Sequence, residues 1–113
     1  MTPRINFPAH RRGTRFFETI MLLDSAGDPK DVSAFGFKCQ GRAYAGAADV
    51  LAELTITIVD AEEGHLEAEF AAADTLAAEL DHVPTVEFSL LSIDGDGDQR
   101  EVAILILPLL PQI

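Results

Sequence analysis

The segment Asp94–Asp98 (DGDGD) has three alternating aspartates, a spacing found at the start of calcium-binding loops. Hard cations such as Ca²⁺ bind several oxygen ligands, and three carboxylates would supply part of such a set. A complete loop also needs a glycine at its sixth position and a glutamate at its twelfth, where this chain has Gln99 and Leu105. Because Asp-Gly is a strong turn signal, the sequence favours a solvent-exposed hairpin tip without a metal.

The other residue types that carry chemistry lack the spacing that catalysis or zinc binding requires. The three histidines are far apart in sequence, and no Cys-x-x-Cys or His-x-x-x-His pair is present. No serine has a Gly-x-Ser-x-Gly context. A catalytic pair of carboxylates could be drawn from Glu62, Glu63, Glu67 and Glu69, but the alternation around them indicates an exposed acidic face. We therefore expect a non-enzymatic protein with no catalytic residues, cofactor or metal.

Cys39 is the only cysteine, so no disulfide can form within the chain. It is in phase with Phe35 and Phe37, which predicts a small buried hydrophobic residue rather than a nucleophile. Nothing here indicates an oxidising compartment or a signal peptide. The longest apolar run, Val102–Leu110, is too short to span a bilayer. We expect synthesis in a cytoplasm and no membrane partner.

Two apolar runs with turn chemistry between them dominate the first half of the chain. Thr14–Leu23 is apolar in both alternating sets of residues, and Val32–Gln40 places aromatic residues at period two. The intervening residues, DSAGDPKD, are typical of a turn. The pattern predicts a β-hairpin, or two strands joined across a sandwich. Because both faces of Thr14–Leu23 are apolar, we expect it to be central or covered on one side by a partner.

The rest of the chain alternates between strand and turn patterns. A short helical turn near residues 74–80, with Asp74 as its cap, is the only helical signal. Together these patterns predict one domain over residues 1–113, an antiparallel immunoglobulin-like β-sandwich of about six to eight strands. The expected later strands are Ala34–Arg42, Val50–Val59, His65–Phe70, Thr85–Ile93 and Arg100–Leu107, preceded by a short first strand within Arg4–Phe7.

Charge is distributed unevenly along this acidic chain. The net charge is −11, yet the first 15 residues contain four arginines and no acid. This excess of acid argues against nucleic-acid binding, which needs a basic face. A basic arm (residues 1–13) and an apolar, proline-containing tail (residues 108–113) predict docking onto neighbouring subunits. The predicted assembly-interface residues are Arg4, Arg11, Arg12, Arg15, Leu107, Leu109, Leu110 and Ile113.

The order of these features resembles the N-terminal immunoglobulin-like domain of phage baseplate upper proteins and related phage tail or prophage structural proteins. The resemblance covers roughly Ile5–Leu107 and departs from the family pattern in having only Phe88 as an aromatic residue after the helical turn. Its residues are Gly13-Thr14, the turn Asp24…Gly27-Asp28-Pro29…Asp31-Val32-Ser33, a strand ending near Arg42, Thr55–Ile58 with Gly64, Asp74-Thr75 and Asp94-Gly95.

The resemblance implies a structural component of a phage or prophage virion, a tail or baseplate adaptor made in the bacterial host cytoplasm. Its expected partners are other virion structural proteins and further copies of itself. The family domain is usually followed by a fibrous or receptor-binding portion, so this chain would be a stand-alone version. The alternative is a small ligand-binding or carbohydrate-binding β-sandwich module. That alternative is weakened because the chain has no tryptophan and Tyr44 is its single tyrosine.

Overall fold

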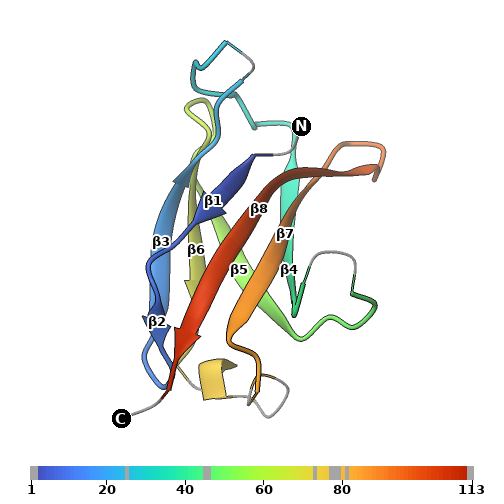
Figure 1. Cartoon of the computed structure of the whole chain (residues 1–113). Coiled ribbons are helices and arrows are strands. Elements are labelled where there is room, and N and C mark those ends of the chain that lie inside the picture. Colours follow the sequence, from blue (N-terminus) through green and yellow to red (C-terminus); the bar gives the residue numbers. More distant parts are fainter. Residues whose placement is uncertain are drawn as a thin grey trace.

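A computed structural model describes residues 3–24, 26–44, 47–72, 74–76, 80 and 82–111. Its strands form one mixed sheet with the order β1-β8-β7-β4-β5-β6-β3, and β2 also pairs with β8. Figure 1 shows this sheet curling on itself. The elements are β1 (Arg4–Asn6), β2 (His10–Arg11), β3 (Phe16–Met21), β4 (Gly36–Arg42), β5 (Ala52–Asp60), β6 (His65–Phe70), the 3-10 helix η1 (Asp74–Leu76), β7 (Thr85–Ile93) and β8 (Gln99–Leu110).

Strand β5 links the two layers of the fold because it changes partner along its length. Its first residues, Ala52–Leu54, pair with β4, whereas Thr55–Asp60 pair with β6. One layer therefore contains β1, β8, β7 and β4, and the other contains β6 and β3. The β4–β7–β8 and β3–β6 pairings are those of an immunoglobulin-like sandwich. The predicted all-β, sandwich-like fold is confirmed.

The first two strands depart from the predicted antiparallel arrangement. The predicted short first strand is present as β1, but it pairs with β8 in parallel, with Arg4 opposite Ile104. The predicted basic arm also contains β2, which pairs in parallel with β8 as well. Pro8 lies between the two short strands and has no amide hydrogen to continue the ladder.

The two apolar runs do not form a hairpin with each other. Strand β3 pairs with β6, and β4 pairs with β5 and β7, so the alternative of two strands joined across the sandwich is the correct one. The predicted central position for the first run is also wrong, because β3 ends the strand order of the sheet. The apolar residues on both faces of Thr14–Leu23 are therefore not explained by a central position in the sheet.

The core fills the space between the two layers and follows the alternation of the strands. Val86, Phe88 and Leu90, which are alternate residues of β7, are fully buried, as are Leu66 and Ala68 on β6. The Phe70 and Phe88 rings meet edge to face, with their centroids 6.1 Å apart. This contact joins β6 of one layer to β7 of the other.

Strand β8 continues through Pro108 to Leu110, which corrects the predicted end of this strand at Leu107. Pro108 lies opposite Thr85 of β7, and the amide of Leu109 donates to the Pro84 carbonyl. Amides alternate in direction along a strand, so the amide position of Pro108 points away from β7. On that side, Pro108 lies between the β8 residues that pair with β1 and those that pair with β2, so no ladder hydrogen bond is lost.

The predicted helical turn is a 3-10 helix at Asp74–Leu76, and residues 77–79 of the predicted segment lie outside the described part of the chain. Thr75 is fully buried there. Its hydroxyl donates to the Ala72 carbonyl (2.7 Å) and accepts from the Gly13 amide (2.7 Å). Thr75 thereby ties the turn to the start of the chain. Within the described ranges, no helix has the length and hydropathy of a membrane span.

Cys39 is buried, as predicted, and its thiol should make stability fall at alkaline pH. Burial, followed by the charge of Glu53, raises the thiol pKa to about 12 from an ordinary value of 9.0. Above pH 9 the unfolded chain loses the thiol proton while the folded chain keeps it. The free energy of unfolding should therefore fall by about 1.4 kcal/mol per pH unit, with no such loss below pH 9.

The measurement is urea unfolding of the wild type and of Cys39→Ala between pH 8 and pH 11. The alanine variant has a constant packing defect but no thiol, so the difference between the two chains isolates the thiol proton. A difference in unfolding free energy between the two chains that stays constant from pH 8 to pH 11 would contradict the expectation.

Candidate functional site

The candidate site begins with the free edge of β3. On one side β3 pairs with β6, and among the described residues no strand pairs with its other side. The Leu22 amide donates to the Gly64 carbonyl at 2.9 Å, which fixes the phase of the ladder. Backbone groups alternate in direction along an antiparallel strand, so those of Phe17, Thr19 and Met21 point away from β6. They form an unpaired row at the sheet edge.

The side chains along this edge are largely apolar and exposed. Phe17 is 43% exposed, Met21 49% and Leu23 57%, whereas Phe16 and Ile20 on the other face are buried in the core. The guanidinium of Arg15 lies 4.7 Å from the Phe17 ring centroid and also pairs with Glu69. Phe17, Met21 and Leu23 form what we call the β3 apolar strip.

A groove of about 740 Å³ adjoins the end of β3, between that strand and the β1–β8 pair. Figure 1 shows β1 and β3 at the same side of the molecule, with β1 joined to β8. The apolar lining of this β1–β3 groove comes from three segments, and its charged lining comes from Asp24, Lys30 and Arg100. The apolar residues are Pro3, Ile5, Met21, Leu22, Leu23, Val102 and Ala103.

The charged residues that line the β1–β3 groove differ in whether they already have bonding partners. One carboxylate oxygen of Asp24 accepts hydrogen bonds from the Ala26 amide (2.9 Å) and the Asp28 amide (3.0 Å). Lys30 lies over the Phe35 ring, 5.7 Å from its centroid, and forms no ion pair with a described residue. Arg100 is exposed and has no ion pair or side-chain hydrogen bond to the described part of the chain. The groove therefore presents two available cations to an occupant.

The four arginines predicted for the assembly interface all bond within their own chain. Arg4 pairs with Glu87 at 2.9 Å, and Arg15 pairs with Glu69. Arg11 donates to the Pro111 carbonyl at 2.9 Å. Arg12 donates to the carbonyls of Leu80 and, at 2.7 Å, Val83. Arg4 is thereby bound to β7 and Arg15 to β6, while Arg11 is bound to the residue that follows β8 and Arg12 to the turn before β7.

The leucines predicted for the assembly interface are divided between the core and the surface. Leu107 and Leu109 are buried inside their own sandwich, while Leu110 is 38% exposed. Ile113 lies outside the described residues. An assembly role for these arginines and apolar residues stays a prediction, and those that the structure describes do not line the β1–β3 groove.

The aspartate-rich hairpin tip is a turn held by its own first residue. One Asp94 carboxylate oxygen accepts from the Asp96 amide (2.9 Å) and the Asp98 amide (3.0 Å). The described residues contain no cluster of three or more histidine, cysteine or carboxylate side chains that could hold a metal. Asp24 makes the same two bonds in its own turn, so the shared pattern Asp-x-x-Gly-Asp was a sequence signal for both turns.

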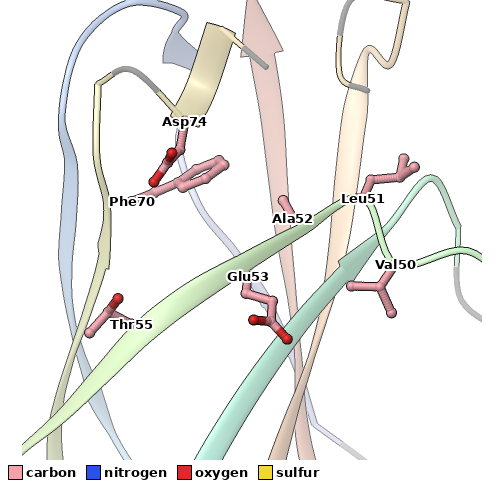
Figure 2. A pocket seen from close by; sticks show the side chains of 7 residues that line it. All are labelled: Val50, Leu51, Ala52, Glu53, Thr55, Phe70 and Asp74. Atoms are coloured by element: carbon pink, nitrogen blue, oxygen red, sulfur yellow. The ribbon is translucent and has the colours of Figure 1, made fainter. Parts of the chain in front are cut away.

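A second hollow, of about 520 Å³, lies where β5 leaves β4. Figure 2 shows that residues at and just before the start of β5 line it together with Phe70 and Asp74. Glu53, Thr55 and Asp74 are its polar residues. Phe70, its aromatic lining residue, is buried, and the exposed Tyr44 does not line it. Its described lining therefore offers carboxylates and a hydroxyl but no exposed ring on which a sugar could stack.

No family model and no curated protein matches this chain. Among solved structures it is similar to a crystal structure of the R347E mutant of the SrpA adhesin from Streptococcus sanguinis, with a TM-score of 0.47 and 12% sequence identity. The match covers 99% of this chain and 56% of the adhesin chain, so this chain spans little more than half of that structure.

Proposed function

We propose that this protein is a non-enzymatic structural component that acts by protein–protein assembly, with the free edge of β3 as its docking surface. The observation that carries the proposal is the coincidence of an unpaired strand edge with an exposed apolar strip on the same residues. Each feature alone is common on protein surfaces, but the two together provide both backbone hydrogen bonds and apolar area for a partner.

Soluble proteins normally protect an edge strand with charges, prolines or a covering loop. The outward-facing residues of β3 are Phe17, Thr19 and Met21, and none of them is charged. Such an edge favours association with another chain. Its presence without a protecting charge, in a chain of net charge −11, supports a docking role. Overall repulsion between like-charged copies then limits indiscriminate contact.

We place this assembly role in a phage or prophage virion, as a tail or baseplate adaptor. The support for this setting is the resemblance of the strand and turn order to phage structural domains. The partners would be other virion structural proteins and further copies of this chain. The apolar edge of β3 agrees with the sequence expectation that a partner covers one face of this run.

The alternative of a ligand-binding or carbohydrate-binding module is favoured by one observation, the 520 Å³ hollow beside β5. Its polar residues could hydrogen-bond a small polar ligand. Carbohydrate recognition normally adds an exposed aromatic platform, and none is found among the residues described around this hollow. The assembly role is therefore the better-supported proposal.

The test of the assembly role is incorporation into particles purified from the source bacterium after phage induction. We expect the wild-type chain to co-purify with particles, as measured by immunoblotting. The double substitution Phe17→Lys and Met21→Lys should reduce its incorporation at least about tenfold, because each lysine places a hydrated charge in the contact.

The matched control is Tyr44→Lys, which changes an exposed apolar residue away from β3. It should be incorporated like the wild type. Absence of the wild-type chain from particles would contradict the virion setting. Equal incorporation of the β3 double variant and the control would contradict the use of this edge.

A further inference from the structure

We propose that the β1–β3 groove receives an extended segment of a partner protein, which adds as a strand along the free edge of β3. This segment has apolar residues at alternate positions and a carboxylate near its N-terminal end that reaches Lys30 and Arg100. The inference rests on the assembly role proposed above and names the chemistry of the partner.

The backbone of β3 supplies the first part of the recognition. The amide and carbonyl groups of Phe17, Thr19 and Met21 point to the open side of the strand. An added strand would pair with them as in a β-sheet, which gives affinity largely independent of the partner's sequence. β3 has six residues, so a segment of similar length, about 20 Å, would satisfy the whole edge.

The walls of the β1–β3 groove supply the second part. Its volume of about 740 Å³ lies within the range of about 300–1,000 Å³ typical of built binding sites. Ile5 and Val102 line it from the β1–β8 pair, and Met21 lines it from β3. Alternate side chains of an added strand point to the same face, so every second residue of the segment should be apolar.

Charge supplies the third part and sets the direction of the segment. β3 runs toward Leu22 and Leu23, which line the groove together with Lys30 and Arg100. A segment that pairs antiparallel to β3 therefore begins beside these two cations. Neither Lys30 nor Arg100 forms an ion pair with a described residue, so both cations remain available for a carboxylate of the partner.

The same charges disfavour a second copy of this chain as the occupant. In an antiparallel β3–β3 pair, the N-terminal end of the second β3 would lie beside Lys30 and Arg100. That end carries Arg15, whose charge would face two further cations. A foreign acidic segment has the opposite charge at this end and fits better.

The experiment measures binding of a synthetic peptide of about eight residues to the full chain by isothermal titration calorimetry. The probe has two aspartates at its N-terminal end, followed by alternating valine and threonine. A comparison peptide has two lysines in place of the aspartates. We expect the acidic peptide to bind at least about tenfold more tightly than the lysine peptide, and less tightly as salt is raised.

Three variants test where the peptide lies. Lys30→Glu and Arg100→Glu should each weaken binding of the acidic peptide about tenfold or more, because each reverses a charge at the proposed contact. Lys38→Glu, an exposed lysine on β4, is the matched control and should keep the wild-type affinity within about twofold. Thr19→Pro should abolish binding of either peptide, since proline removes an edge amide that β6 does not use. Unchanged circular dichroism would show that these variants fold.

Several results would overturn the inference. These are no binding of the acidic peptide, equal binding of both peptides, or equal loss in Lys30→Glu and Lys38→Glu. Concentration-dependent dimerisation that Thr19→Pro removes would assign the edge to a second copy instead. If particle incorporation still depends on Phe17 and Met21 while the peptide fails to bind, the groove inference fails and the assembly role stands.

Discussion

Replacing Phe88 by alanine is expected to lower the free energy of unfolding by about 3–5 kcal/mol, a large part of the roughly 5–15 kcal/mol that stabilises a typical domain. Phe88 is fully buried at the centre of β7 and meets the Phe70 ring across the two layers. Its ring also fills the space over Gly41, where an added Cβ would lie only 2.6 Å from a ring carbon. Neither neighbour can collapse into the void without moving a strand.

Urea unfolding followed by circular dichroism would measure this loss, with Phe17→Ala as the matched control. Phe17 is the same residue type but is 43% exposed on the β3 edge, so its replacement should cost less than about 1 kcal/mol. Losses of similar size in the two variants would mean that the layers do not pack on Phe88 as described.

Alternation along a strand is a local property, and it was predictable from the sequence. The predicted strands His65–Phe70 and Thr85–Ile93 are confirmed as β6 and β7, and alternate residues along them, such as Leu66 and Phe88, are fully buried. The strands β5 and β6 form an antiparallel hairpin, for which the sequence has two alternating runs on either side of a short loop that ends in glycine. In each case the residues that decide the structure lie within a few positions of one another.

Pairing between distant strands was not predictable in the same way. β3 pairs with β6, about fifty residues later, and β1 pairs in parallel with β8 at the other end of the chain. Apolar residues on both faces of β3 fit either a central strand or an edge covered by a partner. Only the pairing of β1 with β8 rather than with β3 decides between them, and no local pattern encodes that choice.

The candidate site was missed for a related reason. Charge and composition drew attention to the chain termini, but Arg12 and Leu107 bond or pack within their own chain. The signal for the β3 apolar strip was present in the second face of Thr14–Leu23. Lys30 and Arg100 are far apart in sequence, so their shared position in the β1–β3 groove becomes visible only in three dimensions.

Gly64, at the end of the β5–β6 loop, is the second position where a single substitution should have a large effect. Its φ is +65°, a backbone conformation that costs a residue with a side chain about 1–2 kcal/mol. A Cβ at this position would lie 2.6 Å from the Lys30 carbonyl oxygen and 2.7 Å from the Leu22 carbonyl oxygen. Because both contacts are to backbone, Gly64→Ala should lower the free energy of unfolding by about 3 kcal/mol or more.

Gly27→Ala is the matched control, because Gly27 also has a positive φ, +86°, but no atom lies within 4 Å of the point where its Cβ would be. It should lose only the conformational cost of about 1–2 kcal/mol, so the difference in urea unfolding isolates the contact with Leu22 and Lys30. Equal losses would show that the loop is not held against β3. Since these two residues line the β1–β3 groove, folded Gly64→Ala should also bind the acidic peptide more weakly than Gly27→Ala.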